Sequence, residues 1–244
     1  MKMYTRLYSL AVVSVLLLSC GTDGVPQPWE VKYQGALKNI MHKGDLSAKA
    51  NILDLQSMPH VYALGAVENL KGEVLILDGM PMISSENDGE LDISRSFDHR
   101  ATLLVYASVE QWNEVPVNQP LNSYEDLEEF VGQMAEQSGI DVDQPFPFMI
   151  KGMVSKLNWH VINWPEGDTE HSHEKHITSG LHGSFADREV EILGFYSNSH
   201  HAIFTHHTTN MHMHVLTNDG QIAGHIDDMI PGSEMQLLVP VVKN

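Results

Sequence analysis

Two segments of the chain carry apolar side chains at the spacing of an amphipathic helix. In residues 33–42 the apolar positions share one helical face, and Gly44 follows where helices commonly end. A second apolar face follows Ser123, which can cap the first turn together with Asp126, and Gly139 ends this pattern. We therefore predict one short helix near the start of the folded body and a longer helix near its middle.

Most of the remaining chain shows the short apolar runs and turn residues that are typical of β-strands. Residues 61–83 are rich in Val, Leu and Ile, interrupted by glycine-containing turns. Further strands are expected at 101–109, 191–196, 211–217 and 235–242. The pattern predicts an α+β protein with a β-rich N-terminal part that carries two helices and a mostly antiparallel C-terminal part. We place the N-terminal domain at 33–144 and the C-terminal antiparallel domain at 145–244.

The first twenty residues have the pattern of a bacterial export signal. Lys2 and Arg6 precede an apolar run that is too short to span a membrane. The run ends in Leu-Leu-Ser-Cys, which resembles a lipobox, so we expect residues 1–19 to be a lipoprotein signal peptide and Cys20 to be lipidated. Residues 20–32 are expected to form a tether. The absence of Asp directly after Cys20 favours the outer membrane, with the body facing the periplasm or the exterior; a conventional signal with a stray cysteine is the alternative.

The charge of the chain argues against nucleic acid as a partner. Fourteen Lys and Arg stand against 32 Asp and Glu, for a formal charge of -18. A body this acidic repels phosphate backbones. Cys20 is the only cysteine, so no disulfide can form within one chain. Of the 15 histidines, 12 fall between His160 and His225, which places the candidate chemistry in the C-terminal half.

Three of these histidines converge in a predicted β-hairpin. The alternating pattern makes His212 and His214 project from one face of a strand. Asp219-Gly220 is a favoured type I′ turn, and counting back from it places His214 opposite His225 and His212 opposite Asp227. Cross-strand neighbours can share one Zn²⁺, and three ligands leave the open position that catalysis needs. Asp227 is then a candidate to orient a ligand imidazole. A polar strand face in contact with solvent is the alternative.

The other histidines of this half form less specific clusters. Residues 171–176 lie in a polar stretch, and we expect a solvated loop there; a loop that touches the site and a second, weak metal site are the alternatives. The pairs His200-His201 and His206-His207 flank a short apolar stretch. Because consecutive strand residues point to opposite faces, at most one member of each pair can face a metal. Most of these side chains are expected to lie at the surface or to be satisfied locally.

The hairpin resembles the zinc-ligand pattern of the α-acetolactate decarboxylase family. The matching phrase runs from Met211 to Gly220 and continues to Gly224-His225, with the same His-x-His pair and the same spacing to the third histidine. Residues 61–79 resemble a second segment of the family, and Glu73 falls on its active-site glutamate. Residues 33–53, 124–127 and 193–196 also fit. The resemblance therefore extends over most of the chain after the tether.

The resemblance implies two linked β-rich domains, zinc in the C-terminal one, and decarboxylation of 2-acetolactate to acetoin. Two departures stand out. Family members carry an active-site Arg shortly after a strand glycine that resembles Gly152, and counting forward places His160 there. They also carry a glutamate on a C-terminal tail, whereas this sequence ends at Asn244 after its last expected strand. His160 is thus the candidate to hold the substrate carboxylate or to donate a proton.

The resulting expectation is a zinc-dependent carboxy-lyase that acts on a 2-hydroxy-3-oxo acid. His212, His214 and His225 would bind Zn²⁺, and Glu73 would be the general acid. The expected partners are this small acid and, through the lipid anchor only, a membrane; a homo-oligomer is compatible with the sequence. One alternative is a non-catalytic periplasmic metal-binding lipoprotein that kept the fold. Another is an anchored structural module that lost the chemistry.

Overall fold

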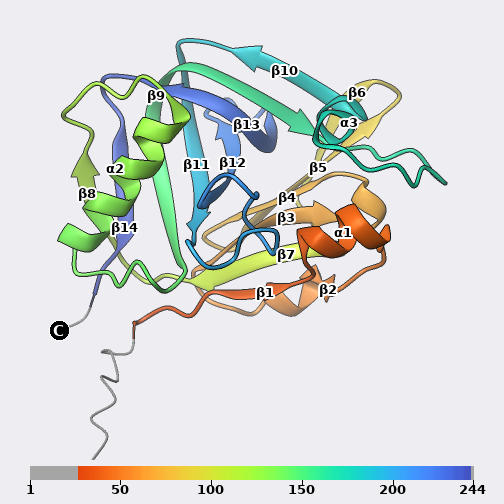
Figure 1. Ribbon diagram of the computed structural model, residues 1–244, viewed down its shortest axis with the longest axis horizontal. Coiled ribbons are helices and arrows are strands. Elements are labelled where there is room, and N and C mark those ends of the chain that lie inside the picture. The colour runs from red at the N-terminus through yellow and green to blue at the C-terminus, as the bar shows by residue number, and fades with distance from the viewer. Residues whose placement is uncertain (1–26, 243–244) are drawn as a thin grey trace, which may run out of the picture.

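The computed structural model describes residues 27–242 (Figure 1). The expected signal peptide and Cys20 lie outside these residues. Within the described part, the strands form two seven-stranded sheets that pack against each other, and the α+β class is confirmed. No helix in this part is long and apolar enough to cross a bilayer.

The first sheet is antiparallel and has the strand order β1-β7-β3-β4-β5-β6, with β2 paired to β7. Its strands are β1 (Lys32–Gln34), β2 (Ala50–Asn51), β3 (Val61–Val67), β4 (Glu73–Leu77), β5 (Met80–Asn87), β6 (Glu90–Ser94) and β7 (Arg100–Ser108). Alternate residues of β4 pack into two different hydrophobic cores. Leu75 and Leu77 face the second sheet, whereas Val74 and Ile76 face a smaller core that includes Ile52. Glu73 shares the parity of Leu75, so the alternation directs its side chain toward the second sheet.

The second sheet is also antiparallel and has the order β11-β12-β13-β9-β14-β8, with β10 paired to β9. Its strands are β8 (Trp112–Pro116), β9 (Phe146–Val161), β10 (Leu181–Phe185), β11 (Arg188–Tyr196), β12 (Met211–Thr217), β13 (Ala223–Pro231) and β14 (Gln236–Pro240). The long strand β9 pairs with both β11 and β13. Strand β11 also pairs with β12, and β12 pairs with β13. Strands β9, β11, β12 and β13 therefore close into a ring, and the histidine-bearing hairpin β12–β13 is part of it.

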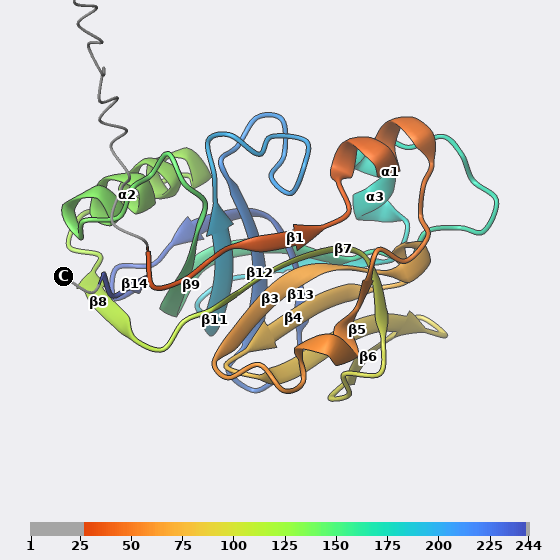
Figure 2. The same cartoon turned by 90° about the horizontal axis from the view of Figure 1, so that it is seen from below.

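Three α-helices and two short 3₁₀ segments complete the described residues. They are α1 (Leu37–Lys43), η1 (Ile52–Leu55), η2 (Glu68–Leu70), α2 (Tyr124–Gln137) and α3 (His173–Thr178). Ser123 caps α2 as predicted, accepting a hydrogen bond from the backbone N–H of Asp126. Helix α1 ends at Gly44 as predicted, but it begins later than expected because Tyr33 pairs with β7. Figure 2 shows α1 and α3 together at one end of the molecule and α2 at the other.

The change from the first sheet to the second occurs earlier in the chain than the expected boundary at 144/145. Strand β8 pairs with β14, and α2 contacts β13, so both elements belong with the second sheet. One continuous core then joins the two sheets: Leu64 and Leu75 from the first pack in the same cluster as Phe148 and Phe195 from the second. The histidine face of the hairpin therefore meets the first sheet across a buried interface.

Candidate metal centre and active site

The hairpin has the predicted register but a different turn. His214 is directly opposite His225, as counted from the sequence. Strand β12 ends at Thr217 and strand β13 begins at Ala223. Asp219 also lacks the positive φ that a type I′ turn requires. Instead, the Asp219 carboxylate accepts hydrogen bonds from Thr217 Oγ1 (2.7 Å) and from the Gln221 backbone N–H (3.1 Å). This longer loop keeps the same pairing, because Thr217 still faces Ile222.

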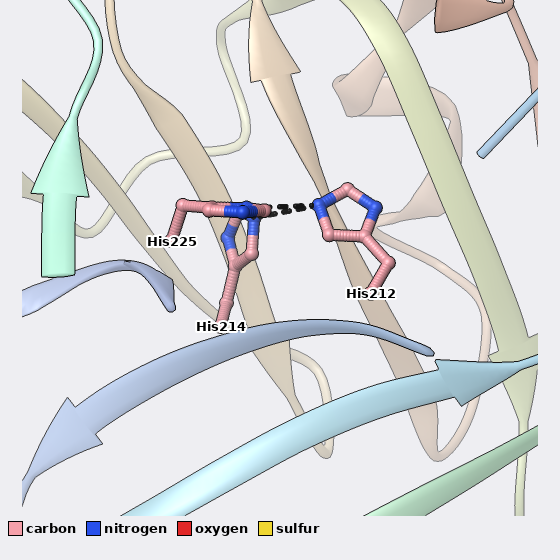
Figure 3. A group of neighbouring side chains, drawn as sticks. All are labelled: His212, His214 and His225. Carbon is pink, nitrogen blue, oxygen red and sulfur yellow. Dashed lines mark hydrogen bonds between the residues drawn. The ribbon is translucent and has the colours of Figure 1, made fainter. Parts of the chain in front are cut away.

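His212, His214 and His225 converge on one point between the sheets (Figure 3). His212 Nε2 lies 3.1 Å from His225 Nδ1 and 3.2 Å from His214 Nε2, and the last two atoms are 3.4 Å apart. Nitrogens at about 2.0–2.1 Å from a tetrahedral zinc ion are about 3.3 Å from one another. The three nitrogens therefore already have the mutual spacing of a zinc ligand set.

Burial keeps these three rings in the neutral form that binds metals. The side chains are at most 8% exposed. Burial lowers the pKa of His212 to about 3 and holds the pKa values of His214 and His225 well below the ordinary value. The Nδ1 atoms of His212 and His214 are buried without a hydrogen-bond partner among the described residues. Three neutral imidazoles that face one another in this way lack enough donors to satisfy each other, whereas a cation would satisfy all three lone pairs.

Glu73 lies directly beside this cluster. Its Oε2 is 3.7 Å from His214 Nε2, and its Oε1 accepts a hydrogen bond from the backbone N–H of Ile162 at 3.3 Å. Burial raises the pKa of Glu73 well above its usual value; the Ile162 hydrogen bond opposes this effect. The preceding Gly72 has φ +145, and a Cβ there would lie 2.0 Å from the Ser84 carbonyl oxygen. Only glycine fits this approach, which fixes the start of β4 and the position of Glu73.

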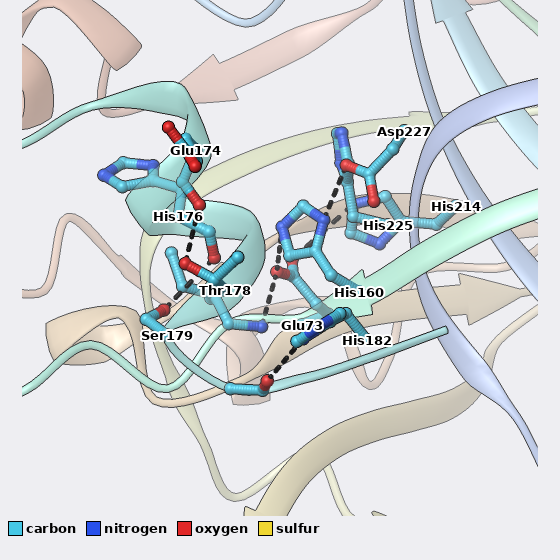
Figure 4. Close-up of polar contacts among 12 residues, drawn as sticks. Glu73, His160, Glu174, His176, Thr178, Ser179, His182, His214, His225 and Asp227 are labelled. Carbon is cyan, nitrogen blue, oxygen red and sulfur yellow. Dashed lines mark hydrogen bonds and ion pairs between the residues drawn. The ribbon is translucent and has the colours of Figure 1, made fainter. Parts of the chain in front are cut away.

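His160 and Asp227 form a pair next to Glu73 (Figure 4). His160 Nδ1 lies 2.8 Å from Asp227 Oδ1, and His160 Nε2 lies 3.8 Å from Glu73 Oε1. The sequence predicted Asp227 opposite His212, where it would orient a metal ligand. In the structure the β12–β13 ladder ends at His214, and Asp227 is the extra residue of a bulge between β13 and β9. The bulge turns its carboxylate toward His160 instead.

Two neighbouring cavities, which share several lining residues, lie beside the three histidines. The inner cavity has a volume of about 60 Å³ and is lined by Glu73, His160 and two of the clustered histidines. The outer cavity has a volume of about 490 Å³, and apolar side chains such as Met41 form part of its wall. Such a volume is ordinary for a small-molecule site. A small ligand in these cavities can thus approach Glu73 and the rings of His212 and His225, whereas His214 lines neither cavity.

The segment 171–176 is partly helical rather than the expected solvated loop. Ser172 caps α3 by accepting a hydrogen bond from the Lys175 backbone N–H, and His171 stacks on the buried Trp164. His173 and His176 line both cavities, so the alternative of a segment that touches the site is the correct one. The polar sequence did not reveal this, because the packing partner Trp164 stands outside the cluster.

His206 also lies at the site, which the sequence analysis did not anticipate. Its ring centroid is 5.5 Å from that of His225 and 6.3 Å from that of His212. Burial lowers the pKa of His206 to about 4. The neighbouring His207 is exposed, in agreement with the rule that only one member of the pair faces the centre. His200 instead stacks on Phe204, with its Nδ1 2.7 Å from Ser197 Oγ.

Comparisons with known proteins give a family from the sequence and a shared fold from solved structures. The family model described as Alpha-acetolactate decarboxylase matches residues 33–244. No curated protein matches the chain in sequence. Alpha-acetolactate decarboxylase from Bacillus subtilis strain 168 is 13% identical, with a TM-score of 0.67 over 88% of this chain and 86% of that one. The acetolactate decarboxylase of Bacillus subtilis subspecies spizizenii is 12% identical, with a TM-score of 0.65 over the same shares.

A Staphylococcus aureus protein gives a similar result. It is described as a protein of unknown function similar to alpha-acetolactate decarboxylase, and it is 15% identical, with a TM-score of 0.64 over 86% of this chain and 84% of that one. At these identities the structural likeness establishes a shared fold.

Proposed function

This chain belongs to the alpha-acetolactate decarboxylase family, and from that premise we propose that it is a zinc-dependent decarboxylase of a 2-hydroxy-3-oxo acid. The observation that carries the proposal is the buried Glu73 carboxyl group, 3.7 Å from His214 Nε2 and beside three convergent imidazoles. 2-Acetolactate, which would yield acetoin, is the first candidate substrate.

Zinc is proposed because the donor set and its spacing suit this ion. His212 and His214 would bind it through Nε2, and His225 through Nδ1, because these are the atoms that converge. When bound, zinc supplies a positive charge that stabilises the negative charge developing on the substrate oxygens as CO₂ leaves. Three protein ligands leave room in the coordination sphere for a substrate.

Glu73 is the proposed general acid. Loss of CO₂ breaks a carbon–carbon bond and leaves its electron pair on the substrate as an enolate, which needs one proton at carbon to become the ketol. Because burial raises the pKa of Glu73, the carboxyl group favours the protonated form and can deliver this proton. The resulting carboxylate takes up a proton from solvent through the cavity before the next turnover.

His160 is proposed to position Glu73 rather than to substitute for an arginine. Its Nδ1 lies 2.8 Å from the Asp227 carboxylate, so this nitrogen is the natural donor. With Nδ1 protonated, Nε2 faces Glu73 Oε1 as an acceptor, 3.8 Å away. An imidazole placed between two carboxyl groups has no free side with which to hold a substrate carboxylate.

The expected export signal bears on the location of the protein. We propose that the protein is anchored to the outer membrane through Cys20, with its body in the periplasm or outside the cell. Support comes from the basic residues and short apolar run before Leu-Leu-Ser-Cys. Under this proposal, the decarboxylase would act on substrate outside the cytoplasm.

The direct test of activity is incubation of the purified, zinc-loaded protein with 2-acetolactate. We expect acetoin and CO₂ in equal amounts, loss of both after removal of zinc with a chelator, and recovery when zinc is restored. Protein that holds one zinc ion per chain yet forms acetoin no faster than the spontaneous reaction would contradict the proposed activity. Several zinc ions per chain without turnover would instead favour the metal-binding lipoprotein.

A further inference from the structure

Three histidines outside the metal cluster stand where the two cavities meet. His173, His176 and His206 line both the inner and the outer cavity. The first two come from α3, and His206 comes from the loop between β11 and β12. Among the described residues, no Lys or Arg lines either cavity. Imidazole is therefore the only basic group that an anionic ligand would meet on its way to the centre.

A 2-hydroxy-3-oxo acid brings a carboxylate that needs a donor at the site. His160 cannot serve, because one ring nitrogen faces Asp227 and the other faces Glu73. The converging nitrogens of the three clustered histidines face one another. His176 already places its Nε2 2.9 Å from His171 Nδ1, and His173 is exposed. His206 is the remaining imidazole at the junction.

The contacts of His206 leave it available as a donor. Its ring lies edge-on to those of His173 and His212, with centroids 5.4 and 6.3 Å away, and is tilted to that of His225. Within the described range 27–242 its contacts are these ring contacts, and no hydrogen bond to another residue engages its ring nitrogens. The ring nitrogens of His206 lie near the three clustered histidines and are available to bind a ligand.

The loop that carries His206 is held firmly against α1. The backbone N–H groups of Leu37 and Lys38, in the first turn of that helix, donate hydrogen bonds of 2.8 Å to the carbonyl oxygens of Ile203 and Ala202. The neighbouring Phe204 is fully buried in the core. These contacts fix the chain two to four residues before His206. The loop therefore holds the His206 imidazole in a defined position, as a ligand-binding residue requires.

We propose that His206 binds the carboxylate of the substrate and so takes the place of a cationic side chain at this site. The proposal rests on the proposed decarboxylase function for the identity of the ligand. An imidazole N–H can donate a hydrogen bond to a carboxylate oxygen, and such charge-assisted bonds are stronger than neutral ones. His173 is exposed, and its ring centroid is 5.4 Å from that of His206, so it adds a second imidazole beside the path of the anion.

The test compares a ligand that carries the carboxylate with one that lacks it. We suggest calorimetric titration of the zinc-loaded protein with 2,3-dihydroxy-2-methylbutanoate, which lacks the ketone and cannot decarboxylate, and with acetoin, which lacks the carboxylate. His206→Ala should weaken binding of the acid by about 10- to 100-fold and change acetoin binding less than about twofold. His206→Arg should restore binding of the acid. The control His60→Ala, an exposed ring paired with Asp78 outside both cavities, should change neither affinity.

Zinc content and turnover separate the possible failures. If His206→Ala loses zinc, or weakens both ligands equally, or weakens neither, the carboxylate role of His206 is overturned even when acetolactate is decarboxylated. If the acid-specific loss is observed but no acetoin forms from acetolactate, the carboxylate site stands and the proposed activity fails. Where turnover is measurable, His206→Ala should raise KM more than it lowers kcat.

Discussion

Asp227 Oδ1 lies 2.8 Å from His160 Nδ1, and this contact joins the bulge of β13 to the long strand β9. Because Asp227 engages one nitrogen of His160, the other nitrogen faces Glu73. The bulge at Asp227 is thus connected through His160 to Glu73, the proposed general acid. Under the proposed function, Asp227 would thereby influence Glu73 without touching the three clustered histidines.

Asp227→Asn should lower kcat by about 10- to 100-fold, the usual cost of losing a residue that orients a functional group. The amide can donate as well as accept, so it no longer fixes which nitrogen of His160 faces Glu73. Zinc content should remain unchanged, because Asp227 contacts none of the three clustered rings by a hydrogen bond. Steady-state kinetics and metal analysis measure both effects. Asp92→Asn, an exposed carboxylate on β6, is the matched control; loss of zinc in Asp227→Asn would show that Asp227 supports the metal ligands instead.

Glu73→Gln should retain zinc and the fold but lose about 10²- to 10⁴-fold in kcat, the range expected for removal of a general acid. Glutamine keeps the shape and can still accept the hydrogen bond from the Ile162 N–H, so the loss would report on the proton. Acetoin formation measures turnover, and circular dichroism checks the fold. Glu90→Gln, exposed on β6, should behave like the parent protein. A Glu73→Gln protein with parental kcat would remove Glu73 from the mechanism.

Alanine at His212, His214 or His225 should abolish tight zinc binding, because each ring contributes one of three converging nitrogens. The combined variant His171→Ala, His173→Ala, His176→Ala should still bind one zinc ion per chain. Equilibrium dialysis followed by metal analysis gives the stoichiometry directly. If the triple variant lost its zinc while the single variants kept theirs, the hairpin could not be the metal site.

The sequence was sufficient for the hairpin register because two local rules agree there. Strand alternation places His212 and His214 on one face, and the Asp219-Gly220 pair marks the turn. The observed turn has another geometry, yet the pairing of His214 with His225 is unchanged. Local sequence patterns specify which residues face each other even when the detailed backbone conformation of the connection differs.

Features that depend on contacts between distant parts of the chain could not be predicted from local sequence patterns. The bulge at Asp227 arises where β13 pairs with β9, which is 65 residues or more away in sequence. His206 reaches the centre because its loop docks on α1, near the start of the folded body. Neither contact leaves a periodic signal in the sequence around these residues. Consequently, the convergence of His212, His214 and His225 could be predicted from local spacing, but the bulge at Asp227 and the position of His206 could not.

Cys20→Ser should release the protein from the membrane fraction, since a serine cannot accept the lipid anchor of a lipobox. Fractionation of cells, followed by detection of the protein in membrane and soluble fractions, measures the change. Incorporation of labelled fatty acid into the parent protein, but not into the variant, provides the control. Membrane retention of Cys20→Ser together with an unlabelled parent would contradict lipidation at Cys20.

Acid should destabilise the metal-free protein over the range from pH 6.5 down to about 4.5. Burial lowers the pKa values of His212, His214 and His225, so these rings stay neutral in the folded protein while the unfolded chain takes up protons below pH 6.5. Glu73 acts in the opposite sense, because its raised pKa gives the folded protein an extra proton above pH 4.5. Burial also lowers the pKa values of His176 and His206 to about 4, so these two rings add to the same effect. Each group contributes about 1.4 kcal/mol per pH unit, so the five rings outweigh one carboxyl group. Urea denaturation across this range should show stability falling with pH, and His212→Gln, which removes one of the five rings, should lower the slope by about a quarter. An unchanged slope in that variant would mean that His212 does not stay neutral in the folded protein.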